Sequence, residues 1–347
     1  MSKNLSSLHG PAPAIHVMSR GWVLLAGVLL LFFMAALSLL VGTRPIAPAS
    51  VLNALIAYDP NSADHIIIHD YRLPRTLLGL LCGTAFAMSG ALIQAATRNP
   101  LADPGLLGVN TGAAFFVTVA VGVLGFHSLN AHVWTALAGA ISATMLVYIL
   151  GVTGREGATP VRLVLAGVAL SAVLAGVTSS ITLLNPRAFD TMRFWAIGSL
   201  AGRDMNVVTT VAPFIVIGIV LGLAASRPLN AVALGNDLAR SLGTDIQRAR
   251  VLVVLAVTLL AGAATAAVGP ISFVGLMVPH VVRWITGPDQ RWIIGMTTIF
   301  GPTLLLAADI LGRLVLFPGE LEAGIVTAFI GAPILILLAR GPKVSGL

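Results

Sequence analysis

Hydrophobic residues occupy eight long stretches of the chain that contain no charged side chain. These stretches are 21–43, 76–97, 104–154, 163–186, 205–226, 251–282, 292–308 and 323–339. A helix needs about 20 apolar residues to cross a bilayer. Two stretches are too long for one crossing, and breaks are expected near Gly125–Asn130 and at Gly269-Pro270 with Pro279. The pattern therefore predicts an all-α polytopic membrane protein with about ten transmembrane helices.

The composition supports this class. Of the 347 residues, 57% are hydrophobic and only 10% are charged, whereas a soluble domain is about a quarter charged. We expect an N-terminal tail over 1–19 and a single membrane domain over 20–342. Cys82 is the only cysteine, which excludes an intrachain disulfide and a thiolate metal cluster.

The net charge of +7 suggests orientation rather than nucleic-acid binding. The arginines are scattered between apolar segments and form no aromatic-studded basic patch, so we expect no nucleic-acid partner. An even number of crossings puts both termini on one side of the membrane. With the N-terminus inside, most of the 20 Lys and Arg residues lie in inner loops, so the positive-inside rule predicts cytoplasmic termini.

The polar segment 228–250 separates two uncharged stretches. Asn236 can cap a short helix, and Gly243 can end it in a left-handed turn. Leucines recur every fourth residue on one face, while the other face carries polar side chains. The leucines are Leu234, Leu238 and Leu242, and the polar residues are Asp237, Arg240 and Ser241. The pattern is typical of a helix lying on the membrane surface, or of one that binds in another protein's groove.

Charged residues near the predicted outer ends of the helices have two interpretations. Arg72 and Arg75 flank Pro74 at an outer mouth, against the positive-inside bias. They could reach lipid headgroups along their apolar stems, or bind an acidic external partner. Asp309 and Arg313 are four residues apart, so they can pair on one helix face.

Hydroxyl side chains recur along the predicted helix over 163–184. The candidates for lining a transport path are Ser171, Thr178, Ser179 and Thr182. Such hydroxyls can also bond to the backbone of their own helix. In the preceding helix, Asn110 and Thr111 are expected to bind a neighbouring helix.

Two halves of the chain follow a similar order in opposite membrane orientation. Each has a Gly/Ala-rich helix followed by a proline-broken turn, at 98–104 and at 269–280. Inverted repeats with interrupted helices are typical of transporters. The chain has no phosphate-binding P-loop, nucleophile elbow or H-E-x-x-H motif, and no clustered intramembrane carboxylates. The missing motifs argue against ATP binding by this chain and against an enzymatic function. The missing carboxylates argue against a proton-coupled carrier.

Several segments together indicate a family. The sequence RLPRTLLGLLCGTAFAMSGALIQAATRNPLADPGLLGVNTGA occupies 72–113, and five shorter matching motifs follow at 194–200, 233–243, 269–283, 308–313 and 324–333. From about residue 20 to 340 the chain resembles the permease subunits of ATP-binding-cassette (ABC) importers for iron–siderophores, haem and vitamin B12, the FecCD family.

The resemblance implies a type II importer fold like that of the vitamin B12 permease, in a bacterial cytoplasmic (inner) membrane. It implies a second permease chain, identical or paralogous, and a periplasmic or lipid-anchored substrate-binding protein. It also implies two ATPase subunits that carry ATP and Mg, so this chain needs no cofactor, metal site or catalytic residue. The implied ATPase-coupling residues are Leu234, Gly235, Asn236, Asp237, Ala239, Arg240, Ser241, Leu242 and Gly243. The implied docking residues for the binding protein are Arg72, Arg75 and Arg313.

The family makes a ferric siderophore the first expectation for the cargo, with haem or cobalamin second. A secondary carrier is the alternative from another class, and it predicts transport that collapses with a protonophore. One departure concerns the residues before the last helix, where the family usually has Glu-Leu-Pro-Val-Gly and this chain has Glu320-Leu-Glu-Ala-Gly324. We expect Glu322 to add negative charge near Arg313 and to weaken docking there.

Overall fold

The computed structural model describes residues 20–152 and 160–340, and this part of the chain is helical with no strands. The expected tail 1–19 and the last two residues of the expected domain lie outside the described residues. Ten apolar helices account for the predicted crossings. They are α1 (Arg20–Leu40), α4 (Leu73–Thr97), α5 (Val109–Gly122), α6 (Leu129–Val152), α7 (Pro160–Leu184), α9 (Met205–Ala233), α11 (Ile246–Val268), α12 (Val274–Thr286), α13 (Gln290–Val315) and α14 (Ala323–Arg340).

Seven of these helices are long and apolar enough to cross a membrane, while α5, α12 and α14 are shorter. Shorter helical elements connect them. They are α2 (Pro48–Ile56), α3 (Ala63–Ile66), η1 (Ile67–Arg72), η2 (Pro104–Leu107), α8 (Pro186–Trp195) and α10 (Asn236–Ser241). The predicted break near Gly125–Asn130 is confirmed, because α5 ends at Gly122 and α6 begins at Leu129.

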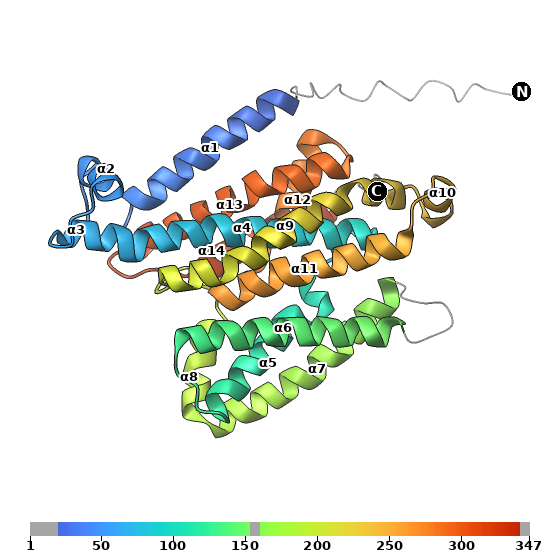
Figure 1. Ribbon diagram of the computed structural model, residues 1–347, viewed down its shortest axis with the longest axis horizontal. Helices are drawn as coiled ribbons and strands as arrows, with labels where there is room; N and C mark the ends of the chain where they lie inside the picture. The colour runs from blue at the N-terminus through green and yellow to red at the C-terminus, as the bar shows by residue number, and fades with distance from the viewer. Residues whose placement is uncertain (1–19, 153–159, 341–347) are drawn as a thin grey trace, which may run out of the picture.

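The helices form two groups that lie side by side (Figure 1). Helix α4 packs against α9, α11, α12 and α13, while α5, α6, α7 and α8 form a second group beside them. Helix α1 lies across the outside of the first group and contacts α13. Most of α4 is buried, so it is the central helix of the bundle.

The bundle has two distinct ends (Figure 1). One end carries α10 and both ends of the described chain, and we call it the α10 end. The opposite end carries α2, α3 and α8, and we call it the α2 end. Arg20 at the start of α1 donates a hydrogen bond to the Thr286 carbonyl oxygen (3.0 Å) at the end of α12. This arrangement agrees with the even number of crossings expected from the sequence.

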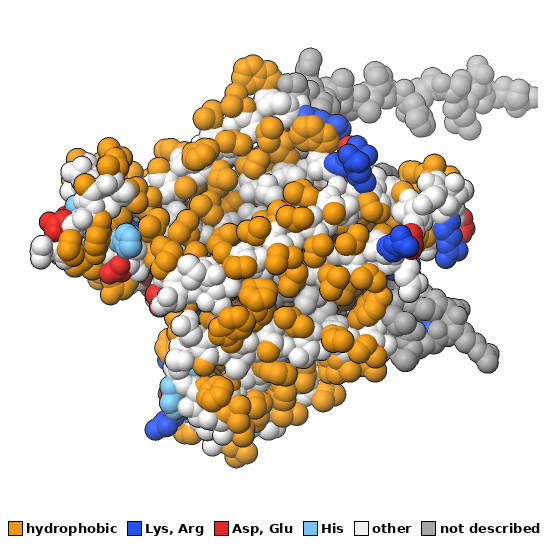
Figure 2. All heavy atoms as spheres, viewed as in Figure 1, with side chains coloured by type: hydrophobic (Ala, Val, Ile, Leu, Met, Phe, Trp, Pro, Cys, Tyr) orange, Lys and Arg blue, Asp and Glu red, His pale blue; other side chains and the backbone are white. Residues whose placement is uncertain are grey.

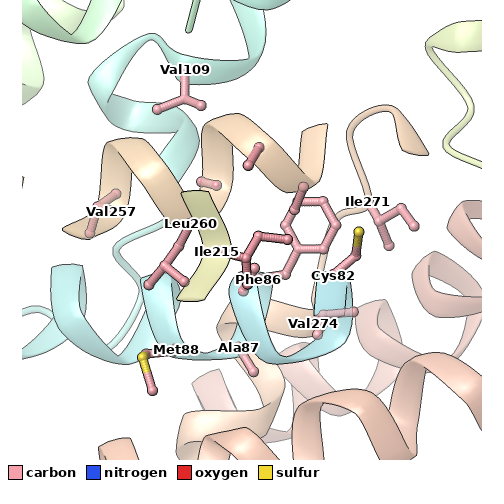
Figure 3. Close-up of a cluster of buried hydrophobic side chains, with 14 of the residues drawn as sticks. Cys82, Phe86, Ala87, Met88, Val109, Ile215, Val257, Leu260, Ile271 and Val274 are labelled. Carbon is pink, nitrogen blue, oxygen red and sulfur yellow. The ribbon is translucent and has the colours of Figure 1, made fainter. Parts of the chain in front are cut away.

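Small residues let α4 approach its neighbours closely. A Cβ atom on Gly90 would overlap the carbonyl oxygen of Gly275, and one on Gly83 would overlap the backbone of Pro302. Phe86 of α4 and Leu260 of α11 fill the space between the helices (Figure 3). Helix packing in membranes depends on such close contacts, because lipid provides little hydrophobic driving force.

The two interrupted segments predicted from proline occur at matching places in the two halves. Helix α4 is followed by a mostly non-helical segment, 98–108, and then by α5. Helix α11 is followed by the non-helical segment 269–273 and then by α12. The further break expected at Pro279 is wrong, because α12 continues through Pro279 to Thr286. Proline has no backbone N–H, and Gln94 donates to the Gly275 carbonyl oxygen four residues before it (3.1 Å). The expected order of helix, break and short helix is therefore present in both halves.

The loop within the polar segment 228–250 is shorter than expected. Helix α9 continues through Pro228 to Ala233, and α11 already begins at Ile246. Membrane helices tolerate an internal proline when neighbouring groups satisfy the freed backbone. The connection is therefore 234–245, which contains α10.

Apolar side chains cover the sides of the bundle, and charged side chains gather at its two ends (Figure 2). On α7 the exposed residues include Leu165, Leu183 and Leu184. This distribution is that of a multi-pass membrane protein, and it leaves an apolar face on α7 that the single chain does not cover.

Candidate functional sites at the two ends of the bundle

Helix α10 starts differently from the prediction. Gly235 occupies the N-cap position with φ of 106°, and no side chain caps the helix. Asn236 is therefore the first helical residue, and its expected role as the cap is wrong. A backbone with this positive φ favours glycine, which has no Cβ, so Gly235 defines the start of α10.

The end of α10 matches the prediction. Gly243 has φ of 74°, and its N–H donates to the Arg240 carbonyl oxygen (2.9 Å). The Thr244 N–H donates to the Ala239 carbonyl oxygen (2.9 Å). These two bonds form a Schellman motif, which satisfies the last carbonyl groups of a helix.

One small residue attaches α10 to the bundle. Ala239 is fully buried and packs with Val232 of α9 and Ile246 of α11. The leucine ridge is left open, because Leu234 and Leu242 are each 61% exposed and Leu238 is 49% exposed. The polar residues Asp237, Arg240 and Ser241 are also exposed. An exposed apolar ridge beside charged residues on a short, anchored helix is suited to binding another protein.

The α2 end contains a buried charge cluster centred on Asp309, whose side chain is 1% exposed. Arg75 of α4 donates to Asp309 (Nη2 to Oδ1, 2.9 Å) and to Glu320 (Nη1 to Oε2, 2.7 Å). Arg313 also donates to the Asp309 carboxylate (Nε to Oδ2, 3.1 Å). The predicted pairing of Asp309 with Arg313 is confirmed, but the bonds to Arg75, far away in sequence, were not foreseen.

Two arginines of this end also hold the last turn of α1. Arg313 donates to the carbonyl oxygens of Ser38 (2.8 Å) and Val41 (2.7 Å). Arg72 donates to the carbonyl oxygens of Leu39 (2.7 Å) and Leu40 (2.8 Å). The last carbonyl groups of a helix have no partner within the helix, so these guanidinium groups satisfy them.

The three arginines expected to bind an external partner are enclosed in this conformation. Arg72 is 5% exposed and Arg313 is 2% exposed, and the Arg75 side chain is 13% exposed. Their donors already bind groups inside the protein, so they do not form an open basic patch in this conformation. Docking by Arg72, Arg75 and Arg313 stays a prediction that requires this end to open.

The position of Glu322 also differs from the prediction. The acidic residue that reaches the charge cluster is Glu320, through Arg75. Glu322 instead lines a separate cavity of about 350 Å³, which Arg203 also lines. The expectation that Glu322 acts on Arg313 is therefore wrong, because the chain between α13 and α14 points the two glutamates into different sites.

A second cavity of about 330 Å³ borders the charge cluster, and Ala201 and Arg203 line both cavities. The Arg203 Nε is buried without a hydrogen-bond partner, and burial lowers the pKa of its guanidinium. Arg203 was not among the residues predicted from the sequence, although its place directly after the glycine-containing turn at 198–202 was an available signal. Trp195 is buried and lines the first cavity.

The hydroxyl groups of α7 do not form one continuous polar stripe. Ser171 accepts a hydrogen bond from Thr111 of α5 (3.0 Å), and Thr182 donates to the Thr178 carbonyl oxygen of its own helix (3.0 Å). Ser179 is exposed. Thr111 therefore binds a neighbouring helix as expected, and so does Asn110, which accepts from Thr265 of α11 (3.0 Å). The assignment of the four α7 hydroxyls to a transport path stays a prediction.

Comparisons with known proteins agree with this architecture. A sequence model of the FecCD transport family matches residues 29–341. The chain is 49% identical to the ferric enterobactin transport system permease protein FepD of Escherichia coli (strain K12), over 90% of this chain and 94% of that protein. It is 39% identical to the Fe(3+)-citrate import system permease protein YfmD of Bacillus subtilis (strain 168), over 93% and 95%.

A solved structure shares the fold. The inward-facing conformation of a metal-chelate type ABC transporter superposes with a TM-score of 0.81 at 27% sequence identity, covering 92% of this chain and 99% of that chain. The family match spans most of the sequence, and the matched relatives are permease subunits of importers. The chain is a multi-pass membrane permease subunit that belongs to the FecCD transport family.

Proposed function

We propose that this chain carries a ferric siderophore across the cytoplasmic membrane as the permease of an ATP-driven importer. The observation that supports this most is the exposed leucine ridge of α10, at the end opposite the buried charge cluster. Similarity to permeases named for ferric enterobactin and ferric citrate supports a ferric complex as the cargo.

In this proposal α10 is the contact with the ATPase subunits. Leu234, Leu238 and Leu242 enter an apolar groove of the ATPase, and Arg240 pairs with an acidic side chain at its rim. The α10 end, which carries both ends of the described chain, then faces the cytoplasm. The Schellman turn at Gly243 and the buried Ala239 fix the helix to α9 and α11, so movement of the ATPase is transmitted to the bundle.

The α2 end faces the outside in this proposal and receives a substrate-binding protein. Docking would open the bonds between Arg75, Arg313 and the carboxylates, so that acidic groups of the partner replace them. Replacing Asp309 or Glu320 by a carboxylate of the partner costs less free energy than leaving an arginine unpaired. The charge cluster would therefore hold the mouth closed until a partner binds.

The apolar face of α7 contacts a second permease chain, identical or paralogous. The cargo path lies between the two copies of α7 and α14. ATP and Mg belong to the ATPase subunits, and this chain catalyses no covalent chemistry.

The cargo test is uptake of radio-iron presented as several ferric siderophores, in cells that lack this chain and in complemented cells. Loss and rescue for one siderophore class supports the proposal. No difference for any siderophore contradicts the iron assignment and directs the test to haem and cobalamin. Uptake that persists with a disabled ATPase and collapses with a protonophore contradicts the ATP-driven importer.

The coupling test is Arg240→Glu, with Arg291→Glu as the matched control. Both arginines are exposed, but Arg291 lies at the start of α13 rather than on α10. We expect Arg240→Glu to reduce uptake at least about tenfold, because a charge reversal at a desolvated contact costs over about 1.4 kcal/mol. The amount of protein in the membrane should not change. Normal uptake by this variant would contradict the ATPase contact.

A further inference from the structure

Arg203 lies beside the charge cluster of the α2 end but is not one of its members. It lies in the turn between α8 and α9, and its side chain lines both cavities at the α2 end. Its Nε is buried and lacks an acceptor. None of the hydrogen bonds or ion pairs found among the described residues involves Arg203, in contrast to its neighbours.

The other arginines around the second cavity are already satisfied. Arg44 pairs with Asp64 (3.1 Å), and Arg75 and Arg313 share Asp309. Arg72 donates to backbone carbonyl oxygens at the end of α1. The cavity therefore keeps a surplus of positive charge after the ion pairs are formed, and Arg203 is the donor that remains open for a ligand.

The first cavity adds features suited to a small molecule. Phe194 and Trp195 supply aromatic surface, and Thr191, Ser199 and His132 add polar groups to the same lining. Its volume of about 350 Å³ is in the usual range for small-molecule sites, roughly 300–1,000 Å³. A single carboxylate from a docking protein would need neither the aromatic surface nor this volume.

A buried donor without an acceptor is costly, and the Nε of Arg203 is such a donor. An arginine stays protonated at neutral pH, so the cost is relieved by an anion rather than by loss of a proton. Planar oxyanions match the fork of N–H groups on a guanidinium. The chemistry of the site is therefore that of an anionic, oxygen-rich ligand with an aromatic portion.

We infer that Arg203 is a binding residue for an anionic iron chelate of the catecholate type, held where the two cavities meet. This inference rests on the proposed function, because it takes the α2 end as the side from which the chelate enters. The chelate's phenolate oxygens bind Arg203, and its rings pack against Phe194 and Trp195.

Glu322 gives the site a second, opposing charge. It lines the first cavity with Arg203, and the described residues show no ion pair between them. Its carboxylate repels an anion, so it limits how tightly the chelate binds. Removing this charge should therefore have the opposite effect to removing Arg203.

The test measures equilibrium binding of radio-iron tris-catecholate to the complete transporter complex in lipid nanodiscs. We expect Arg203→Gln to bind at least about tenfold more weakly, as for loss of a charge-assisted hydrogen bond. Arg203→Lys should fall between this variant and the wild type, and Glu322→Gln should bind more tightly. Arg187→Gln is the control, because Arg187 is exposed on α8 and lines neither cavity.

The outcomes separate the site from the proposed function. Wild-type affinity in Arg203→Gln overturns the site, and so does an equal loss in the Arg187 control. Weaker docking of the binding protein with unchanged chelate affinity would assign Arg203 to docking instead and also overturn it. Binding that depends on Arg203, in a complex that shows no ATP-dependent uptake, supports the site and contradicts the proposed function. The elution profile and thermal unfolding of each variant show whether it is folded.

Discussion

The two ends of the bundle use charged residues in opposite ways. At the α10 end, Arg240 and Arg248 are exposed, and the structure is held by local features such as the turn at Gly243 and the cap at Asp245. At the α2 end, Arg72 and Arg313 are buried and bind groups that are far away in sequence. Residue type alone therefore does not indicate whether an arginine is available to a partner. Its burial and its acceptors decide that.

The two ends of the bundle also differ in what stabilises them. Local caps and turns at the α10 end each contribute about 1 kcal/mol, so changing one should leave the fold intact. A buried charge network stabilises the fold as a unit, because removing one charged group leaves its partners buried and unpaired. Variants at the two ends should therefore differ in how much they destabilise the protein.

Asp309→Asn should destabilise the protein most. The amide cannot neutralise Arg75 and Arg313, and breaking a buried ion pair costs about 3–5 kcal/mol. Thermal unfolding of the purified protein in detergent measures the loss. Asp70→Asn is the control, since this carboxylate is exposed and should change the free energy of unfolding by less than about 0.5 kcal/mol. Equal stability of the two variants would show that the charge cluster does not hold the α2 end.

Leu238→Glu should separate function from folding at the α10 end. Leu238 is half-exposed and contributes little to the core, so the unfolding temperature should stay close to that of the wild type. ATP-driven uptake should fall at least about tenfold, because a charge enters an apolar contact. Leu238→Met keeps the apolar surface and should retain uptake. An active Leu238→Glu variant would mean that the leucine ridge lies on the membrane instead.

Gly243→Ala tests whether α10 depends on its turn. An alanine in this left-handed conformation costs about 1–2 kcal/mol, and the cost should appear as a lower unfolding temperature. Gly176→Ala is the matched control, because Gly176 lies within α7 and a Cβ there meets open space. Helix propensity predicts that this control is unchanged or slightly stabilised. A loss of similar size in both variants would contradict a special role for Gly243.

Asp289→Ala should have the smallest effect, and the effect should depend on pH. Asp289 caps α13 and accepts hydrogen bonds from the Asn230 side chain (2.8 Å) and the Arg291 N–H (3.0 Å). The bond from Asn230 is the main cause that lowers the pKa of Asp289 below its ordinary value of 3.8. The ionised form therefore stabilises the folded protein above that pH, and this contribution is lost as the pH falls through the lowered pKa.

The expected loss for Asp289→Ala is about 1 kcal/mol at neutral pH, as for other helix caps. Unfolding experiments from pH 7 to pH 3 should show the wild type and the variant converging below about pH 4. Asp204→Ala, which removes the cap of α9, is a second cap for comparison. A difference that grows as the pH falls would contradict the assigned direction of the pKa shift.

The sequence by itself determined the number of apolar helices, the breaks between them and the short amphipathic helix in the middle. These features follow from local rules of hydrophobic length, proline placement and glycine turns, and they are visible in residues such as Pro270 and Gly243. The pairing of Asp309 with Arg313 was also accessible, because the two residues are one helical turn apart.

Only the tertiary structure decided which charged residues are available. Arg75 meets Asp309 because α4 packs against α13, and Arg72 reaches the end of α1 because η1 turns beside it. Glu320 and Glu322 are two residues apart but enter different sites, since the connection between α13 and α14 is not helical. Contacts between residues distant in sequence depend on how the helices pack, and no local pattern encodes them.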